Sequence, residues 1–337
     1  MARSHPTIID VAQKAGVSKS TVSRVLQGNG QPVHEETQKA VQKAIQQLGY
    51  EHNAVASSLR TERTNMIMLI MPDITNPFWP DVARGLQDTI EKAGYSVVLA
   101  NSDWDAHREK QFLATARRNR FDAIAINPAA VTEKELSLNR APIVILGLRE
   151  DFKNIDMVGS DSYHGTLQAL DYLYKLGHRR IGFIRGEHNS GRGQARYNGY
   201  TEFLKRGSLP LRPELIVEVP FELESGRKAF TTLMSLKKPP TAIFASNDVL
   251  AIGAMQSAAE MGVVIPDDLS IIGMDNIYSS LMTTPALTTM SKSKYEIGKQ
   301  AADLLLNRIN GTAPAKRARI VIPCELIERR STAPPRR

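Results

Sequence analysis

The stretch IIDVAQKAGVSKSTVSRVLQG, residues 8–28, decides how the N-terminal part of the chain folds. Its first half has apolar residues at positions 8, 11, 12 and 15, the spacing of one helical face, and Thr7 with Asp10 forms a capping-box pattern before it. Gly16 allows the left-handed backbone that ends a helix, and Ser18 can cap a second helix. Two short helices joined by a tight turn predict a helix-turn-helix, with an unspecialised helical hairpin as the alternative.

The second helix carries side chains suited to DNA. Val22, Val25 and Leu26 form its apolar stripe, so that Lys19 and Arg24 lie on other faces. The polar start of such a helix can reach base edges in the major groove, where a guanidinium is a strong donor. This stretch therefore indicates a helix that contacts DNA.

A third periodic segment, HEETQKAVQKAIQQLGY (residues 34–50), completes a three-helix domain. The segment NAVASSLR (residues 53–60) follows, and a helix of this length is marginal in water unless something packs against it. Leu59 would be an exposed apolar residue beside Arg60, which suggests a wedge for a minor-groove base step. The alternative is a plain linker in which Leu59 docks on the rest of the protein.

Residues 5–64 strongly resemble the DNA-binding headpiece and hinge helix of the LacI/GalR family of bacterial repressors. The opening stretch and VHEETQKAVQKAIQQLGYEHNAVASSLRT (residues 33–61) carry the resemblance without gaps. It implies a headpiece over residues 1–52, a hinge helix with its linker over residues 53–64, and a dimer in which the two copies of Leu59 meet in a kinked base step. The side chains that it implies for DNA contact are Thr7, Ser18, Lys19, Ser20, Thr21, Ser23, Arg24, Asn53, Ala56, Leu59 and Arg60.

Positive charge is concentrated at the two ends of the chain. The 337 residues carry a formal charge of +8, with 8 basic and 5 acidic side chains in residues 1–65 and 7 basic and 2 acidic ones in residues 311–337. Residues 66–310 carry 28 of each sign. This distribution predicts a polyanion contact near a terminus, with a solubilising tail as the alternative. Residues 331–337, STAPPRR, are rich in Pro and Arg and predict a disordered tail.

The composition predicts a soluble protein of two or three domains. Hydrophobic residues make up 42% of the chain, and a domain typically has about 150 residues. The single cysteine, Cys324, can form no internal disulfide and no cysteine-based zinc site. The longest apolar run, Met66–Met71, is far shorter than the roughly 20 residues of a membrane span, and the N-terminus has no apolar secretory segment. We therefore expect a cytoplasmic protein without membrane contact.

Strand-like and helix-like segments alternate beyond residue 65, which predicts parallel sheets with right-handed crossovers. The length exceeds what one such core holds, so we expect an α/β body of two lobes. The predicted strands are residues 66–71, 96–101, 123–127, 142–147, 180–186, 215–219, 242–246 and 270–275. The predicted helices are residues 78–94, 107–118, 165–176, 192–205, 225–235, 248–260 and 294–310.

Ligands of open α/β sheets bind beyond the carboxyl ends of the strands, so polar and aromatic residues at those ends are candidates for a site. Asp73, Asn127 and Asp275 follow predicted strands, and their side chains can bind hydroxyl groups. Phe78 and Trp79 can stack on a sugar or purine ring. Asn and Asp after a strand can also cap the next helix, and we expect that role for Asp248 but ligand contact for Asp275.

Two arginines suggest an acidic ligand. Arg192 and Arg196 are four residues apart in a predicted helix, so both can face a cleft and bind hydroxyls or a carboxylate. A solvated helix face is the alternative. The surrounding GRGQARYNG lacks the lysine and spacing of a P-loop, so a nucleoside triphosphate is not expected.

The body also resembles the LacI/GalR family, in PDITNPFWPDVARGLQ (72–87), GHRRIGFIRG (177–186), RYNGY (196–200), PTAIFASNDVLAIGAM (240–255), IPDDLSIIGMDN (265–276), TPALTTM (284–290) and LIERRST (326–332). The resemblance implies a periplasmic-binding-protein-like fold over residues 65–330. Its N-lobe would comprise about residues 65–162 and 292–322, and its C-lobe about residues 163–291 and 323–330.

The same resemblance implies roles in the cleft. Phe78 and Trp79 would form an apolar wall, Asn127 and Arg196 would bind hydroxyls, Phe221 would stack, and Asp275 would take paired hydroxyls. Gly147-Leu148 stands where purine-binding members have an aromatic wall, which disfavours a purine. The side chains expected to contact an effector are Asp73, Phe78, Trp79, Asn127, Leu148, Ser190, Arg192, Arg196, Phe221, Asn247 and Asp275.

These observations predict a transcriptional regulator, in particular a repressor, that binds a palindromic double-stranded DNA operator as a homodimer. A small molecule in the cleft, a sugar or sugar derivative that could be acidic, would control it allosterically; a purine-type corepressor is the alternative. A solute-binding protein is disfavoured by the headpiece and by the lack of a secretory signal. The chain contains no G-x-S-x-G, H-E-x-x-H or opening G-x-G-x-x-G pattern, so we expect neither an enzyme nor a metal or other cofactor.

Overall fold

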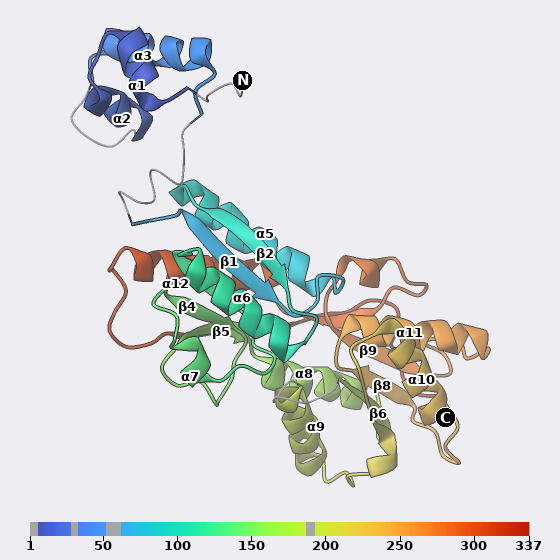
Figure 1. The fold of residues 1–337 in the computed structure, drawn as a ribbon. Helices are drawn as coiled ribbons and strands as arrows, with labels where there is room; N and C mark the ends of the chain where they lie inside the picture. The colour runs from blue at the N-terminus through green and yellow to red at the C-terminus, as the bar shows by residue number, and fades with distance from the viewer. Residues whose placement is uncertain (1–5, 28–32, 52–61, 187–192, 337) are drawn as a thin grey trace. The chain divides into compact units, whose positions relative to one another are not determined.

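The computed structural model describes residues 6–27, 33–51, 62–186 and 193–336. The chain divides into two compact units, Met1–Thr64 and Asn65–Arg337 (Figure 1). We call the first unit the headpiece and the second the body.

The described part of the headpiece consists of three helices, α1 (Ile8–Ala15), α2 (Lys19–Gln27) and α3 (Glu35–Leu48). Thr7 caps α1 in the predicted capping box with Asp10, and Gly16 ends α1 in the left-handed conformation with φ 67°. The fully buried side chains of Val11, Val22 and Val41 join the three helices in one small core. The predicted helix-turn-helix is therefore confirmed.

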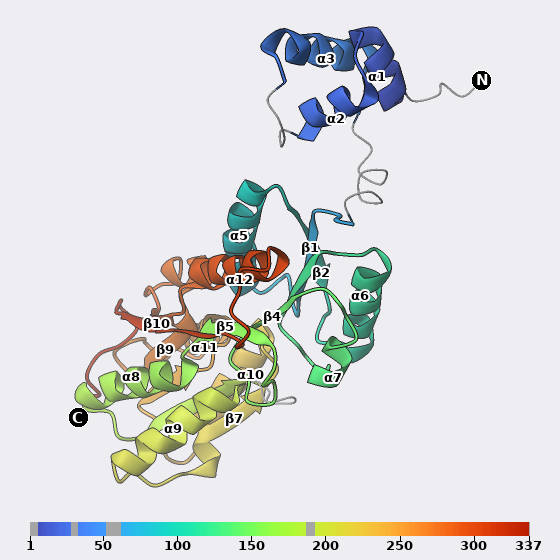
Figure 2. The same ribbon diagram turned by 90° about the vertical axis from the view of Figure 1, so that its left-hand side faces the viewer.

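The first lobe of the body is a parallel sheet with helices on both faces. Figure 2 shows α5 (Phe78–Ile90) and α12 (Lys294–Ile309) on one face and α6 (Ala106–Arg118) with the short α7 (Glu133–Leu136) on the other. A short 3-10 helix, η1 (Glu91–Ala93), continues α5. The strands lie in the order β11 (Arg319–Ile322), β5 (Asp156–Ser160), β4 (Ile143–Leu146), β3 (Ala123–Ile126), β1 (Met66–Met71) and β2 (Ser96–Asn101).

Alternation along β1 explains this layering. Ile67, Leu69 and Met71 pack toward α5 and α12, while Met68 and Ile70 pack toward α6. The two helices on the first face approach closely, because a side chain at Gly85 or Gly298 would overlap a backbone carbonyl of the other helix.

The second lobe has the same architecture. Helices α8 (Ser162–Lys175) and α9 (Gln194–Arg206) share one core with its sheet, and α10 (Leu223–Met234) and α11 (Asp248–Glu260) share the other. Two 3-10 helices, η2 (Pro213–Leu215) and η3 (Tyr278–Leu281), lie in its connections. The strands lie in the order β12 (Glu325–Ile327), β10 (Thr288–Ser291), β9 (Ser270–Asp275), β8 (Ala242–Ala245), β6 (Ile181–Gly186) and β7 (Ile216–Val219), and all are parallel except β12.

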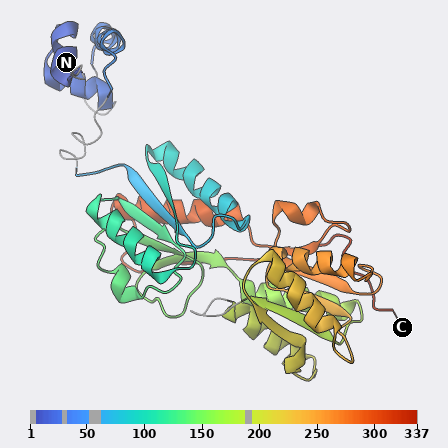
Figure 3. The same ribbon diagram turned by 45° about the vertical axis from the view of Figure 1, so that its right-hand side comes forward.

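The chain passes between the lobes three times, after β5, after β10 and between β11 and β12 (Figure 3). This confirms the expected α/β body with two lobes and parallel sheets. The sequence missed β5, β10, β11 and β12, which are three to five residues long and include polar residues such as those of TTMS. It also missed the four-residue helix α7.

The expectation of a disordered tail over residues 331–337 is wrong for the described residues 331–336. The buried Ser331 hydroxyl donates to the carbonyl of Ile271 at 2.6 Å and accepts from the N–H of Thr288 at 2.8 Å. The N–H of Ala333 donates to the Ser270 hydroxyl at 3.0 Å. Because its polar groups are satisfied by the second sheet, this Pro-containing segment is ordered without regular secondary structure.

Candidate functional site

The first candidate surface is the start of α2 in the headpiece. The Ser18 hydroxyl accepts a hydrogen bond from the N–H of Thr21 at 3.1 Å and lies 2.7 Å from the hydroxyl of Ser20, which fixes the first turn. Lys19, Ser20 and Arg24 are exposed, as is Thr7 ahead of α1. Their side chains are therefore accessible to a macromolecular ligand, and Thr21 is half-buried beside them.

Ser23 is the exception among the residues predicted to contact DNA in α2. Its side chain is only 8% exposed because it lies on the face that packs into the headpiece core next to Val22. The structure thus contradicts a role for this side chain in an accessible contact surface. Four further predicted residues, Asn53, Ala56, Leu59 and Arg60, lie outside the described residues.

The second candidate site is a cavity of about 740 Å³ in the body. Residues of both lobes line it, including the ends of β5 and β9 and the first turns of α5, α8 and α9. It therefore lies at the carboxyl ends of the strands, where the rule for open α/β sheets predicts it.

Aromatic side chains form part of the cavity wall. The rings of Phe78 and Trp79 meet edge to face with centroids 5.1 Å apart, and Trp104 and Phe221 also line the cavity. The ring of Phe221 lies against Gly186, where a side chain of any size would overlap it. Such walls can stack on the apolar face of a ring-shaped ligand.

Two asparagines at strand ends also line the cavity. The Nδ2 of Asn127 donates to the carbonyl of Leu146, and the Oδ1 of Asn247 accepts from the N–H of Leu250 at 2.9 Å. Asn247 has extended backbone angles and is the N-cap of α11.

The prediction that Asp248 caps α11 is therefore wrong, because Asp248 is already the first helical residue. Its fully buried carboxylate instead accepts from the N–H of Ile277 at 2.9 Å and from the hydroxyl of Thr289. Burial raises the pKa of Asp248 to about 7, and the charge of Asp275 adds to this effect.

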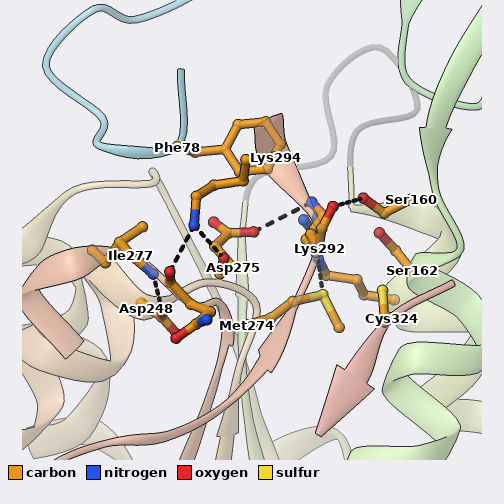
Figure 4. A network of polar contacts seen from close by, with 12 residues as sticks. Phe78, Ser160, Ser162, Asp248, Met274, Asp275, Ile277, Lys292, Lys294 and Cys324 are labelled. Carbon is orange, nitrogen blue, oxygen red and sulfur yellow. Dashed lines mark hydrogen bonds and ion pairs between the residues drawn. The ribbon is translucent and has the colours of Figure 1, made fainter. Parts of the chain in front are cut away.

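Asp275 lines the cavity and lies beside Lys292 (Figure 4). Its carboxylate is 3.3 Å from the ammonium of Lys292, which stands 4.6 Å from the centre of the Phe78 ring. Arg196 lines the same cavity, and its Nε lies 3.2 Å from the sulfur of Met274. Burial lowers the pKa of Lys292; Asp275 opposes this effect and Arg196 adds to it.

A third cation, Lys294, connects the two lobes and does not line the cavity. Lys294 begins α12, yet its ammonium donates to the carbonyls of Asp275 and Asn276 at 3.0 and 2.6 Å (Figure 4). It also forms an ion pair with Asp81 of α5 at 3.3 Å. The strand end that carries Asp275 is thus joined directly to helices of the other lobe.

The structure brings most of the predicted cleft residues together. Phe78, Trp79, Asn127, Leu148, Arg196, Phe221, Asn247 and Asp275 all line the cavity. Asp73 does not, because its carboxylate accepts from the N–H and hydroxyl of Thr75 at 2.8 and 2.6 Å and closes a local turn. Ser190 and Arg192 lie outside the described residues.

Sequence reasoning missed Lys292, Trp104, Arg149, Arg319 and the segment 160–163. Lys292 and residues 161–163 follow β10 and β5, strands that were not predicted, so the strand-end rule was never applied there. Trp104 lies in the loop after β2, one residue beyond the segment 101–103 that the strand-end rule indicated there.

No group of three or more His, Cys, Asp or Glu side chains that could hold a metal ion occurs in the described parts of the chain. Within the same residues, no helix is long and apolar enough to cross a membrane.

Comparisons with known proteins find matches to both the headpiece and the body. The description "Bacterial regulatory proteins, lacI family" matches residues 7–53, and "Periplasmic binding protein-like domain" matches residues 170–332. The HTH-type transcriptional regulator DegA of Bacillus subtilis is 33% identical over 334 residues, which cover 97% of this chain and 98% of DegA. The HTH-type transcriptional repressor PurR of Pasteurella multocida is 35% identical over 329 residues, or 96% and 98% of the two chains.

A solved structure extends the likeness to three dimensions. The LacI family transcriptional regulator from Enterococcus faecium with bound ribose is 30% identical, with a TM-score of 0.74 over 80% of this chain and all of that chain. These relatives are transcriptional regulators rather than enzymes.

Proposed function

The chain belongs to the LacI family of bacterial regulatory proteins and is a DNA-binding transcriptional repressor of that family, and from this premise we propose that a carbohydrate-type effector in the body cavity controls its binding to a palindromic operator. The protein would act in the cytoplasm as a homodimer. The observation that carries the proposal is the cavity between the lobes, which aromatic rings line together with the buried carboxylate of Asp275.

The headpiece supports operator binding through α2. Lys19, Ser20 and Arg24 are exposed on one short helix whose opposite face is packed into the core. A helix with this polar face can enter the major groove, where arginine and lysine donate to guanine and serine can donate or accept. We assign base contact to these three side chains and contact with the phosphate backbone to Thr7, Ser18 and Thr21.

Exposed apolar side chains on the body support a homodimer. In η3 and the residue after it, Tyr278, Leu281 and Met282 are 74%, 54% and 71% exposed, and in the first lobe Leu99 of β2 is 50% exposed. Large apolar side chains that lie close together on a surface, as those of η3 do, mark contact surfaces. A second copy of the chain is the partner that a palindromic operator requires, because two-fold symmetry in the DNA demands two-fold symmetry in the protein.

The chemistry of the cavity supports a polyhydroxylated ligand. A carboxylate and carboxamides can bind hydroxyls, and the rings of Phe78 and Phe221 can stack on the apolar face of a sugar. The relative from Enterococcus faecium was crystallised with ribose, which agrees with this class. A purine-type ligand is disfavoured because residues 147 and 148 supply a glycine and a leucine to the wall rather than an aromatic ring.

The position of the cavity offers a route for allosteric control. Ser160, Ser162 and Lys292 line the cavity where the chain crosses from one lobe to the other. A ligand that binds there contacts both lobes and their connections, so it can favour one relative arrangement of the lobes over another. Its effect on operator affinity equals the ratio of its affinities for the two arrangements, typically 5–150-fold in allosteric proteins, about 1–3 kcal/mol.

The test combines operator selection with variants of α2. DNA fragments that the full chain retains would be selected from genomic DNA, and binding would be measured by fluorescence anisotropy. Arg24→Ala and Lys19→Ala should each weaken specific binding at least tenfold, and Lys43→Ala, an exposed lysine on α3, should change it less than twofold. Equal binding by Arg24→Ala and the unmodified chain would refute the assignment of α2.

A further inference from the structure

The charged residues at the rim of the cavity are paired with one another. Arg149 forms an ion pair with Asp151 at 2.6 Å, and Arg319 pairs with Glu150 at 2.6 Å. The side chain of Glu150 is 91% exposed and that of Asp151 is 58% exposed. Each acid neutralises the charge of the arginine with which it pairs. Because the acids are exposed, water screens these pairs, and they contribute little to the electrostatic potential deeper in the cavity.

The charges deeper in the cavity do not balance. Lys292 is 8% exposed and Asp275 is 4% exposed, and Arg196 is partly buried over Met274 at 3.2 Å. Within the described residues, Asp275 is the acid that pairs with Lys292, and Arg196 has no acid in ion-pair contact. Asp161 also lines the cavity, but its carboxylate is 26% exposed and lies 2.7 Å from the imidazole of His164. Asp275 is therefore the one fully buried carboxylate that stands beside these two cations among the described residues. Buried charges are costly unless they are compensated, so this interior favours an additional negative charge.

The neighbouring ionisable groups leave this excess in place. Burial raises the pKa of Cys324 to about 11, so the thiol is neutral at physiological pH. Burial raises the pKa of Asp248 to about 7, so this carboxylate carries negative charge at pH 7.5, and the ammonium of Lys294, which donates to the carbonyls of Asp275 and Asn276, offsets it. The acid that pairs with Lys294, Asp81, is 57% exposed in its side chain and is solvated away from the cavity.

A second observation concerns the carboxylate itself. The Oδ1 atom of Asp275 is buried, and within the described residues no donor reaches it with hydrogen-bond geometry; the Lys292 ammonium approaches it at 3.3 Å as an ion pair only. A buried carboxylate oxygen without a donor is rare in folded proteins and is suited to a hydroxyl group supplied by a ligand. The cavity thus offers an acceptor for a hydroxyl next to cations for an anion.

From these two observations we propose that the effector is a polyhydroxylated monocarboxylate of the aldonate or uronate class. Its carboxylate binds Lys292 and Arg196, and one of its hydroxyls donates to Asp275. A single negative charge balances the interior, whereas a phosphate ester, with a charge of about −1.5 to −2, would exceed it. This inference rests on the proposed function, because it names the ligand class of the same cavity.

The test compares matched ligands on the full chain by isothermal titration calorimetry at pH 7.5. D-Gluconate, D-glucuronate and D-galacturonate are paired with D-sorbitol, D-glucose and D-galactose, and D-glucose 6-phosphate is included as a dianion. At least one acid should bind at least tenfold more tightly than its neutral counterpart and more tightly than the phosphate ester. If no acid binds, or a neutral sugar or the phosphate ester binds as tightly as the acids, the proposal is overturned.

Variants identify the cation. Lys292→Gln should weaken binding of the acid at least tenfold more than it weakens binding of the neutral counterpart, while Lys299→Gln, an exposed lysine on α12, should change neither. Unchanged acid binding by a folded Lys292→Gln protein would overturn the assignment, and the ligand preference of the unmodified chain decides the matter if that variant does not fold. If only a neutral sugar binds, and Asp275→Asn abolishes that binding, the proposed acid class is wrong but the proposed function stands. If no ligand of the panel binds in a way that depends on Asp275, both proposals are wrong.

Discussion

Replacing Lys294 with methionine tests whether the contact between the lobes is energetically important. Methionine has similar length but no donor, so the variant removes two hydrogen bonds from the ammonium to the carbonyls of Asp275 and Asn276, at 3.0 and 2.6 Å. A hydrogen bond from a charged group contributes about 1.5–3 kcal/mol, and removal of a buried ammonium returns part of its desolvation cost. The ion pair with Asp81 adds little because that side chain is 57% exposed. We expect the free energy of unfolding to fall by about 2–3 kcal/mol.

Equilibrium urea unfolding of the full chain at pH 7.5, followed by far-UV circular dichroism, measures this change. The matched control is Lys299→Met on the same helix, whose ammonium makes a surface pair with Glu296 at 3.5 Å and should contribute less than about 0.5 kcal/mol. The urea dependence of the unfolding free energy should be the same in both variants, so that the midpoint reports the difference. A loss below about 0.5 kcal/mol in Lys294→Met would refute the stabilising role of this contact.

Three further substitutions test other parts of the body. Asp275→Asn should weaken effector binding at least tenfold in calorimetry while operator affinity without effector stays within twofold; a retained response would contradict the cleft assignment. The pKa of Asp248 is raised to about 7, so the stability that this group contributes is fully present below about pH 4 and is lost as pH rises through 7. Asp248→Asn should therefore gain stability relative to the unmodified chain between pH 5 and pH 8 in urea titrations, and parallel pH profiles would argue against the raised pKa. Arg308→Met leaves the buried carboxylate of Asp156 without its bidentate partner at 2.7 and 2.9 Å and should lower the unfolding free energy by about 3–5 kcal/mol, part of which Asp156→Leu in the same chain should restore.

Local signals predicted the headpiece well. Thr7 and Asp10 form the capping box that their spacing indicates, and Gly16 ends α1 with the left-handed backbone expected of glycine. These features involve contacts within a few residues of the chain, and a sequence displays such contacts directly. The burial of Ser23 could not be predicted in this way, because it depends on how α2 rotates against α1 and α3.

Periodicity predicted the long, apolar elements of the body and missed the short, polar ones. Strands such as β1 and β9 are buried and fully or largely apolar, so their sequence patterns are strong. Thr288–Ser291 forms a strand because it pairs with β9 on one side and β12 on the other. β12 lies more than 30 residues further along the chain and was itself not predicted. Tertiary contacts rather than local propensity therefore determine β10.

One missed strand had a consequence for the site. Lys292 follows β10 directly, so the strand-end rule would have placed it in the cleft had β10 been predicted. The first residue of α11 was also misplaced. The N-cap is the residue before the first helical residue, so the cap was assigned to Asp248 when it is Asn247. An error of one residue in a boundary thus assigned the cap to a carboxylate that the structure places in the core.

The positions of the basic residues indicate where the protein binds anions better than the net charge of each segment does. The five excess positive charges in residues 311–337 suggested a free basic tail, yet Arg336 pairs with Asp267 and Asp268, Arg319 pairs with Glu150, and Arg317 approaches Asp156 at 3.5 Å. These basic residues serve the fold of the body and leave the polyanion contact to the headpiece. In the nominally neutral middle of the chain, by contrast, the buried carboxylate of Asp275 pairs with Lys292, and Arg196 lines the same cavity without an acid in ion-pair contact among the described residues. A segment with no net charge can therefore contain the strongest local demand for an anion, because buried charges interact far more strongly than exposed ones.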